Sequence, residues 1–293
     1  ALGYGGYSAT AYGNFTESWN GSSWTEVNNL NSGRYAVFGF GADNTSALAF
    51  GGYDTAVRAY TESWNGSSWT EVADLNTARY SMGGLGIATA GLGYGGDTSP
   101  GRSALSELWN GSAWTETGDL NEARNQTYGG GTTTAGITAG GYPSPSAVTA
   151  KTEEWSGSSW AEVNDLNTPR RGPAGLGTSS LALAVGGSLY PTSPVASAEE
   201  WNSTQSVGAW STGGSLNTAR RKIAGAGTQT SGLAFGGNTT HPGSTDSALN
   251  ESYNGTSFSE TADLNTARRG LGGAGADNTA ALAFGGYDPS ART

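Results

Sequence analysis

A pair of aromatic residues around a short turn recurs six times along the 293-residue chain and constrains the fold more than any other feature. Four copies read Trp-x-x-x-x-Trp, the fifth is stretched, and the sixth has Tyr253 and Phe258. All ten tryptophans belong to this motif: Trp19, Trp24, Trp64, Trp69, Trp109, Trp114, Trp155, Trp160, Trp201 and Trp210. The first aromatics lie 45, 45, 46, 46 and 52 residues apart. A nearly fixed period of this length indicates a repeat architecture.

Two further segments recur with the same period. A Leu-Asn-x-x-Arg segment occurs six times and supplies one arginine to each repeat. These arginines are Arg34, Arg79, Arg124, Arg170, Arg220 and Arg268. A Gly pair after a short apolar run occurs seven times, from Gly5-Gly6 to Gly285-Gly286. The chain therefore contains one more Gly pair than aromatic pairs.

The residues within each repeat are typical of short β-strands. Residues 47–50 and 281–284 are apolar runs that end at glycine, as buried strands do. Residues 61–64 and 69–72 alternate polar and apolar side chains around Asn65-Gly66, and Asn-Gly between such runs indicates a β-hairpin. A Gly-rich run after each arginine supplies a further strand. Four antiparallel strands in each repeat predict one blade of a β-propeller.

The predicted architecture is all-β, a single domain over residues 1–293 with six four-stranded blades in a ring. Stacking buries the aromatic pairs between blades, and ring closure removes exposed strand edges. We expect the C-terminal first strand, around residues 270–275, to join the N-terminal third and fourth strands. One second strand, at residues 1–6 or 281–286, is then surplus. A seventh, incomplete blade is the alternative.

These motifs resemble the kelch-repeat family, whose signature is a Gly pair after an apolar strand followed by two spaced aromatic residues. The first aromatic here is Trp where kelch repeats usually have Tyr. The resemblance covers essentially the whole chain and implies a β-propeller. The recurring sequence Glu-Ser-Trp-Asn-Gly-Ser-Ser-Trp also resembles the repeats of kelch-like proteins of marine tailed phages and bacteria. That resemblance implies an adhesin or tail-fibre module at a virion surface or in the extracellular space.

The overall charge and the cysteine count exclude several classes of function. The formal net charge is −10, which repels phosphate backbones, so we expect no nucleic-acid partner. The chain has no cysteine, which excludes disulfides and thiolate chemistry. No apolar stretch is long enough to span a membrane. Because both ends fall within a repeat, we expect the native protein to extend beyond them or to have been processed.

Most acidic residues recur in register, which favours a structural role over a catalytic one. One glutamate lies two residues before each first aromatic: Glu17, Glu62, Glu107, Glu153, Glu199 and Glu251. We expect each of these to pair with an arginine of a Leu-Asn-x-x-Arg segment through charge-assisted, bidentate hydrogen bonds. The off-register acids, Glu122 and Asp246 among them, form no evident carboxylate pair for glycoside hydrolysis.

The sequence predicts neither an enzyme nor a metal or cofactor site. His241 is the only histidine, and one histidine without cysteine cannot build a typical zinc or copper site. The segment His241-Pro242-Gly243-Ser244-Thr245-Asp246 contains Ser, His and Asp, but a loop does not hold a catalytic triad on rigid elements. We therefore expect no catalytic residues.

The variable parts of the repeats are the loops after the Gly pairs, and strand order places them all on one face of the ring. Loops on a rigid scaffold are the usual place for binding residues, although neutral drift explains such variation equally well. The candidate ligand-binding residues in them are Arg58, Tyr60, Arg102, Tyr142, Lys151, Tyr190 and His241. The predicted function is recognition of a protein or glycan surface. A purely architectural module that packs against other virion or cell-surface subunits is the alternative, and a glycan-acting enzyme is a distant one.

Overall fold

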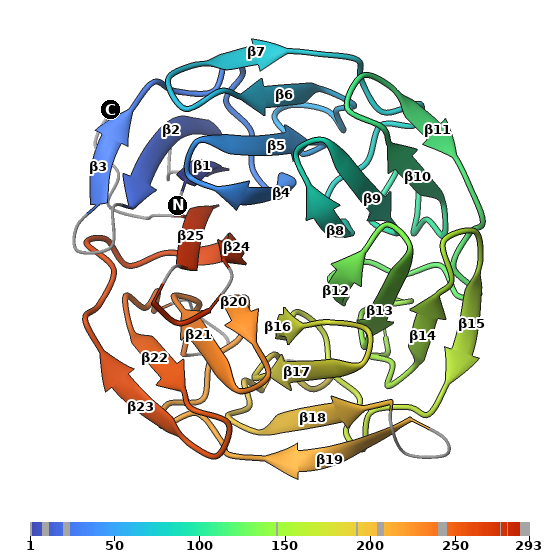
Figure 1. The fold of residues 1–293 in the computed structure, drawn as a ribbon, viewed down its shortest axis with the longest axis vertical. Coiled ribbons are helices and arrows are strands. Elements are labelled where there is room, and N and C mark those ends of the chain that lie inside the picture. Colours follow the sequence, from blue (N-terminus) through green and yellow to red (C-terminus); the bar gives the residue numbers. More distant parts are fainter. Residues whose placement is uncertain are drawn as a thin grey trace.

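The computed structural model describes residues 2–7, 12–19, 24–144, 146–191, 193–203, 208–239, 245–275, 277–279 and 281–287. Within these residues, strands form six blades around a central axis (Figure 1). The innermost strands β4, β8, β12, β16, β20 and β24 each contact the next, and β24 contacts β4. The predicted six-bladed β-propeller is therefore confirmed, and the ring is closed.

Five blades are four-stranded sheets of consecutive strands, numbered here by their order in the chain. The first blade comprises β4 (Phe38–Asp43), β5 (Ser46–Phe50), β6 (Thr61–Trp64) and β7 (Trp69–Glu71). The second comprises β8 (Gly83–Ile87), β9 (Ala90–Tyr94), β10 (Ser106–Trp109) and β11 (Trp114–Glu116). The third comprises β12 (Tyr128–Thr132), β13 (Ala135–Ala139), β14 (Thr152–Trp155) and β15 (Trp160–Val163). The fourth comprises β16 (Ala174–Gly177), β17 (Leu181–Val185), β18 (Ala198–Asn202) and β19 (Ala209–Gly213). The fifth comprises β20 (Ala224–Thr228), β21 (Ser231–Phe235), β22 (Asn250–Tyr253) and β23 (Phe258–Thr261).

The sixth, closing blade contains strands from both ends of the chain. Its order is β24 (Arg269–Gly275), β25 (Ala281–Tyr287), β1 (Leu2–Tyr7), β2 (Tyr12–Trp19) and β3 (Trp24–Val27). As expected, the C-terminal first strand β24 joins the N-terminal third and fourth strands. Neither second strand is left out, because β25 pairs with β24, β1 pairs with β2, and Tyr7 and Tyr287 form a parallel bridge. The closing blade therefore has five strands.

The aromatic pairs pack between neighbouring blades. The eight tryptophans whose side chains are described are all buried; the side chains of Trp19 and Trp24 lie outside the described part. The paired indoles lie 5.3–5.6 Å apart between ring centroids. The second indole of a pair also reaches the preceding blade: Trp114 Nε1 donates to Thr61 Oγ1 at 3.1 Å. Trp69, Trp160 and Trp210 make the equivalent bond, so each of these four Trp pairs fixes both the contact and the alignment between two blades.

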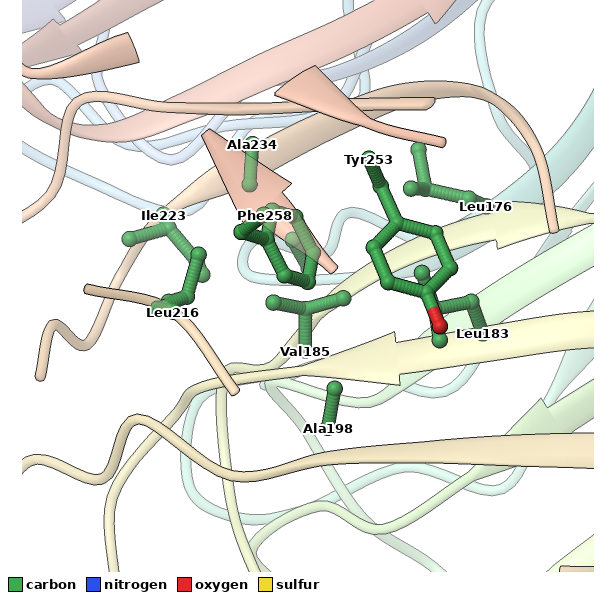
Figure 2. Close-up of a cluster of buried hydrophobic side chains, with 10 residues drawn as sticks. Leu176, Leu183, Val185, Ala198, Leu216, Ile223, Ala234, Tyr253 and Phe258 are labelled. Atoms are coloured by element: carbon green, nitrogen blue, oxygen red, sulfur yellow. The ribbon is translucent and has the colours of Figure 1, made fainter. Parts of the chain in front are cut away.

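Figure 2 shows one inter-blade core, between the fourth and fifth blades. Leu183 and Val185 of β17 pack against Tyr253 and Phe258, which are the sixth aromatic pair. Tyr253 and Phe258 are buried in the same manner as the indoles elsewhere. The sixth aromatic pair therefore occupies the same place in the propeller with smaller side chains.

The expected Arg–Glu pairs are present in all six repeats. They are Arg34–Glu62, Arg79–Glu107, Arg124–Glu153, Arg170–Glu199, Arg220–Glu251 and Arg268–Glu17, at 2.5–3.0 Å. They differ from the expectation in one respect, because the hydrogen bonds of Arg34, Arg79, Arg170 and Arg220 reach one oxygen of the glutamate rather than both. The other oxygen of Glu107, for example, accepts hydrogen bonds from the backbone and side chain of Asn76. Each glutamate thus ties the connector between two blades to a buried strand.

Aromatic side chains of neighbouring blades explain why the innermost strands are rich in glycine. Gly175 of β16 lies under the ring of Tyr128, and a Cβ atom there would lie 1.2 Å from Tyr128 Cδ2. Gly39 and Gly129 lie similarly close to the hydroxyls of Tyr4 and Tyr94. Because these rings are buried, any side chain at the glycine positions would displace part of the core. The inner wall is therefore thin and leaves space around the axis.

Candidate binding face

The variable loops and the inter-blade connectors lie at the same end of the ring, which we call the loop face. Antiparallel bridges join the residue after each repeat arginine to the residue after a Gly pair, as in Tyr35–Tyr53 and Arg171–Ser188. The Gly pair makes the turn into this face possible. Gly51 and Gly52 have φ of 65° and 113°, and a Cβ on Gly51 would lie 2.4 Å from the Arg79 carbonyl oxygen. The strand pattern and the Gly pairs together hold the loops around the central axis.

Arg58 and Tyr60, in the first loop, interact mainly with their own loop. Arg58 Nε donates to both carboxylate oxygens of Asp54, at 2.8 and 2.9 Å. The Arg58 guanidinium also lies 5.3 Å from the ring centroid of Tyr60. The bonds to Arg58 and to two backbone amides hold the pKa of Asp54 at about 2, although desolvation opposes this. These contacts give the loop a defined shape.

Arg102 and Tyr142 come together on the loop face with a residue that the sequence analysis did not consider. Arg102 pairs with Asp97 at 2.9 Å and lies 5.0 Å from the ring centroid of Tyr142. Arg171 also lies over Tyr142, at 4.3 Å from its centroid. The Tyr142 ring therefore contacts two guanidinium groups from different blades, an arrangement that cation–π attraction stabilises.

The other three candidates are not brought together. Lys151 pairs with Glu162 at 2.7 Å between exposed side chains of the third blade. Tyr190 is 48% exposed at the tip of its loop. His241 lies outside the described residues. Of the predicted candidates, the structure therefore brings Arg58 to Tyr60 within one loop and Arg102 to Tyr142 between blades, and Arg171 joins the second pair.

The central channel opens on the loop face through a ring of six residues, which we call the channel mouth. They lie two positions after the repeat arginines: Ala36, Ser81, Gln126, Gly172, Lys222 and Gly270. All six have positive φ, between 49° and 66°. Backbone hydrogen bonds run from one blade to the next, from Ser81 to Ala36, Gln126 to Ser81, Gly172 to Gln126 and Gly270 to Lys222. Backbone hydrogen bonds thus join most of the mouth, and side chains project from four of its six positions, Ala36, Ser81, Gln126 and Lys222.

A cavity of about 570 Å³ lies along the channel. Its wall includes the inner strands and, at the loop face, Tyr35, Ser81, Gln126, Lys222 and Arg269. This volume is within the range of small-molecule sites, roughly 300–1,000 Å³. The channel can therefore hold a ligand of moderate size.

Half of the face around the mouth is aromatic. Tyr12, Tyr35, Tyr53 and Tyr80 form the tyrosine cluster, at the closing, first and second blades, with ring centroids 5.5–6.5 Å apart. Their side chains are half-buried, so part of each remains accessible to solvent. Apolar ring surface edged by hydroxyl groups can stack on a ligand and hydrogen-bond to it.

The other half is basic. Arg171, Arg221, Lys222 and Arg269 form the basic cluster, on the connectors that enter the fourth and fifth blades and at the start of β24 in the closing blade. Lys222 is exposed to the channel, but the surrounding protein displaces much of the bulk water. This desolvation, together with Arg269, Arg221 and Arg171, lowers the pKa of Lys222 to about 8. The cluster therefore concentrates positive charge in a protein with a net charge of −10.

One position of the repeat, directly after the arginine, indicates the channel mouth in the sequence. The residue after the repeat arginine is Tyr35, Tyr80, Asn125, Arg171, Arg221 or Arg269. This position holds Tyr or Asn in the first three repeats and Arg in the last three, so its character changes halfway around the ring. The sequence analysis sought binding residues only in the loops after the Gly pairs and gave this position no role.

No protein-family profile matches this chain, and no curated protein matches it significantly. In the part of the chain that the structure describes, no helix is long and apolar enough to cross a membrane. Those same residues include no group of three or more His, Cys, Asp or Glu side chains placed to hold a metal ion.

Proposed function

We propose that this protein is a non-enzymatic binding module that recognises a glycan or protein surface through its loop face. The observation that carries the proposal is the contrast between uniform blades and a varied channel mouth. The Trp pairs, Arg–Glu pairs and Gly pairs repeat around the ring, whereas the tyrosine and basic clusters occupy different halves of the mouth. Such differences on a rigid scaffold are typical of recognition sites.

The same proposal places the chain among kelch-type propellers at a virion or cell surface, as part of an adhesin or phage tail fibre. Its support is the combination of Gly pairs, spaced aromatics and nearly identical repeats. A six-bladed ring with this repeat is compatible with the kelch type. An extracellular module of this kind contacts its target through one exposed face, and the loop face offers the varied side chains.

The test is binding to glycan and protein arrays by the wild type and by a loop-face variant. The variant carries Tyr35→Asn, Tyr80→Asn and Arg221→Asn, because Asn125 shows that the ring accepts asparagine at this position. Ser67→Ala with Ser112→Ala, in the hairpin turns of the opposite face, is the matched control.

We expect the wild type and the control to bind the same ligands and the loop-face variant to lose them. Urea unfolding of all three proteins verifies that the variant is folded. A folded loop-face variant that binds as well as the wild type refutes the proposal, as does a wild type that binds nothing on either array.

A further inference from the structure

The basic cluster carries more positive charge than its own surroundings neutralise. Arg269 pairs with Asp246 at 2.6 Å. Over the residues that the structure describes, no carboxylate lies within 4 Å of a charged nitrogen of Arg171, Arg221 or Lys222. Their polar contacts are neutral: Arg221 Nε donates to Asn238 Oδ1 at 3.0 Å, and Arg171 Nε donates to Ser188 Oγ at 3.3 Å.

This concentration of charge is not required by the fold. The equivalent positions in the first three blades hold Tyr35, Tyr80 and Asn125, and those blades have the same strand pattern. The structural arginines stand one position earlier, and each of those has its glutamate. Like charges so close repel one another: beside desolvation, Arg171 and Arg269 both lower the pKa of Arg221. A bound anion would relieve this repulsion.

The wall opposite the basic cluster suits the ring of a sugar. In a six-membered ring, the first blade faces the fourth and the second faces the fifth, as β4 and β16 do in Figure 1. Tyr35 and Tyr80 therefore lie across the mouth from Arg171 and from Arg221 with Lys222. Aromatic faces stack on apolar C–H surfaces, and the amide of Gln126 and the hydroxyl of Ser81 can bond hydroxyl groups at the cavity wall.

The backbone of the mouth favours a sugar over an extended peptide. Peptides that add to a sheet need unpaired backbone groups along an edge. Here the mouth residues bond one another, as in Gln126 N to Ser81 O at 3.1 Å and Gly172 N to Gln126 O at 2.8 Å. Recognition at the mouth must therefore rely mainly on side chains, which offer guanidinium, ammonium, amide, hydroxyl and phenol groups.

We propose that the channel mouth binds an acidic oligosaccharide, with the basic cluster holding its oxyanion and the tyrosine cluster stacking on its sugar rings. The proposal rests on the loop face being the binding face, and it names the class of ligand. Guanidinium groups bond carboxylate and sulfate through parallel N–H donors, and the ammonium of Lys222 supplies a point charge beside them.

Isothermal titration calorimetry with matched acidic and neutral probes tests this site. The probes are trigalacturonate with its methyl ester, and a sulfated galactose trisaccharide with its unsulfated form. Lys222→Gln and Arg221→Asn remove one cation each, and Gln126, with φ of 49°, shows that the backbone at Lys222 accepts glutamine. Lys151→Gln removes one cation from the outer surface as the control. Hexaglutamate is the peptide probe.

We expect at least one acidic probe to bind more tightly than its neutral form, which identifies carboxylate or sulfate as the oxyanion. Each cluster substitution should weaken that binding by about tenfold to a hundredfold, which is the contribution of a charged hydrogen bond. The control Lys151→Gln should bind the probe as tightly as the wild type. Tyr80→Asn should weaken binding of the acidic and neutral forms alike.

Equal binding of acidic and neutral probes, or no effect of Lys222→Gln and Arg221→Asn, overturns the acidic-glycan site. Tighter binding of hexaglutamate than of either acidic sugar overturns it in favour of an acidic peptide. After any of these results, the loop face still stands as the binding face, provided that the loop-face variant loses the array ligands that the wild type binds. Retention of array ligands by that variant refutes the broader proposal instead.

Discussion

Replacing Glu107 with glutamine should destabilise the propeller by about 3–5 kcal/mol, the usual cost of leaving a buried charge without its partner. Glu107 is 1% exposed and Arg79 is fully buried, and they meet at 2.7 Å. Burial lowers the pKa of Arg79, and Glu107 opposes that shift. The substitution keeps the size of the side chain and its acceptor oxygen toward Asn76, so the loss is mainly that of the carboxylate charge.

Urea unfolding monitored by tryptophan fluorescence measures the free energy of unfolding of each variant. Glu162→Gln is the control, because it breaks the exposed Lys151–Glu162 pair and should cost less than about 1 kcal/mol. Arg79→Met combined with Glu107→Gln should be less destabilising than the sum of the single changes, since both charges are then gone. A loss below about 1 kcal/mol for Glu107→Gln, or additive single changes, would refute the buried-pair reasoning.

Three further predictions test other parts of the structure. Trp114→Ala should lower the free energy of unfolding in urea by about 3–5 kcal/mol. Trp114→Phe should lower it by only about 1–2 kcal/mol, because Phe258 fills the equivalent place in another blade. Equal losses for the two variants would contradict the packing. Gly175→Ala should cost more than about 2 kcal/mol, as the new Cβ overlaps Tyr128, whereas Gly101→Ala, with no atom within 4 Å, should change stability little. Lys222 has a pKa of about 8 in the folded protein against 10.5 ordinarily, so between these values the unfolded chain binds more protons. Between pH 8 and 10.5, the free energy of unfolding of the wild type should therefore rise relative to that of Lys222→Gln. Below pH 8 the difference between the two proteins should stay constant. A difference that is constant over the whole pH range would mean that the pKa is not lowered.

The repeated features of the fold were predictable because the motif that specifies each of them recurs several times in the sequence. The Asn-Gly hairpin between Trp64 and Trp69 and the pairing of Arg79 with Glu107 follow from residues that recur in register. The closing blade was predicted only in part. Residues 1–6 and 281–286 have nearly the same pattern, and periodicity cannot show that both pair within one sheet.

The site was less predictable because it depends on ring geometry. Arg58 is a recognition-type residue in a variable loop, yet the neighbouring Asp54 binds it within that loop. Arg221 and Lys222 follow a structural arginine, and their proximity to Arg171 and Arg269 appears only when the connectors converge on the axis. Residues 47 to 98 positions apart in the chain thus become neighbours at the mouth.

A crystal structure of the protein with trigalacturonate, or with the sulfated trisaccharide if that binds more tightly, tests the central claim most directly. The account predicts density for the ligand at the channel mouth, with its acidic group beside Arg221 and Lys222 and a sugar ring against Tyr35 or Tyr80. Ligand density on the outer strands or at the Asn-Gly turns of the opposite face, with an empty mouth, would contradict it.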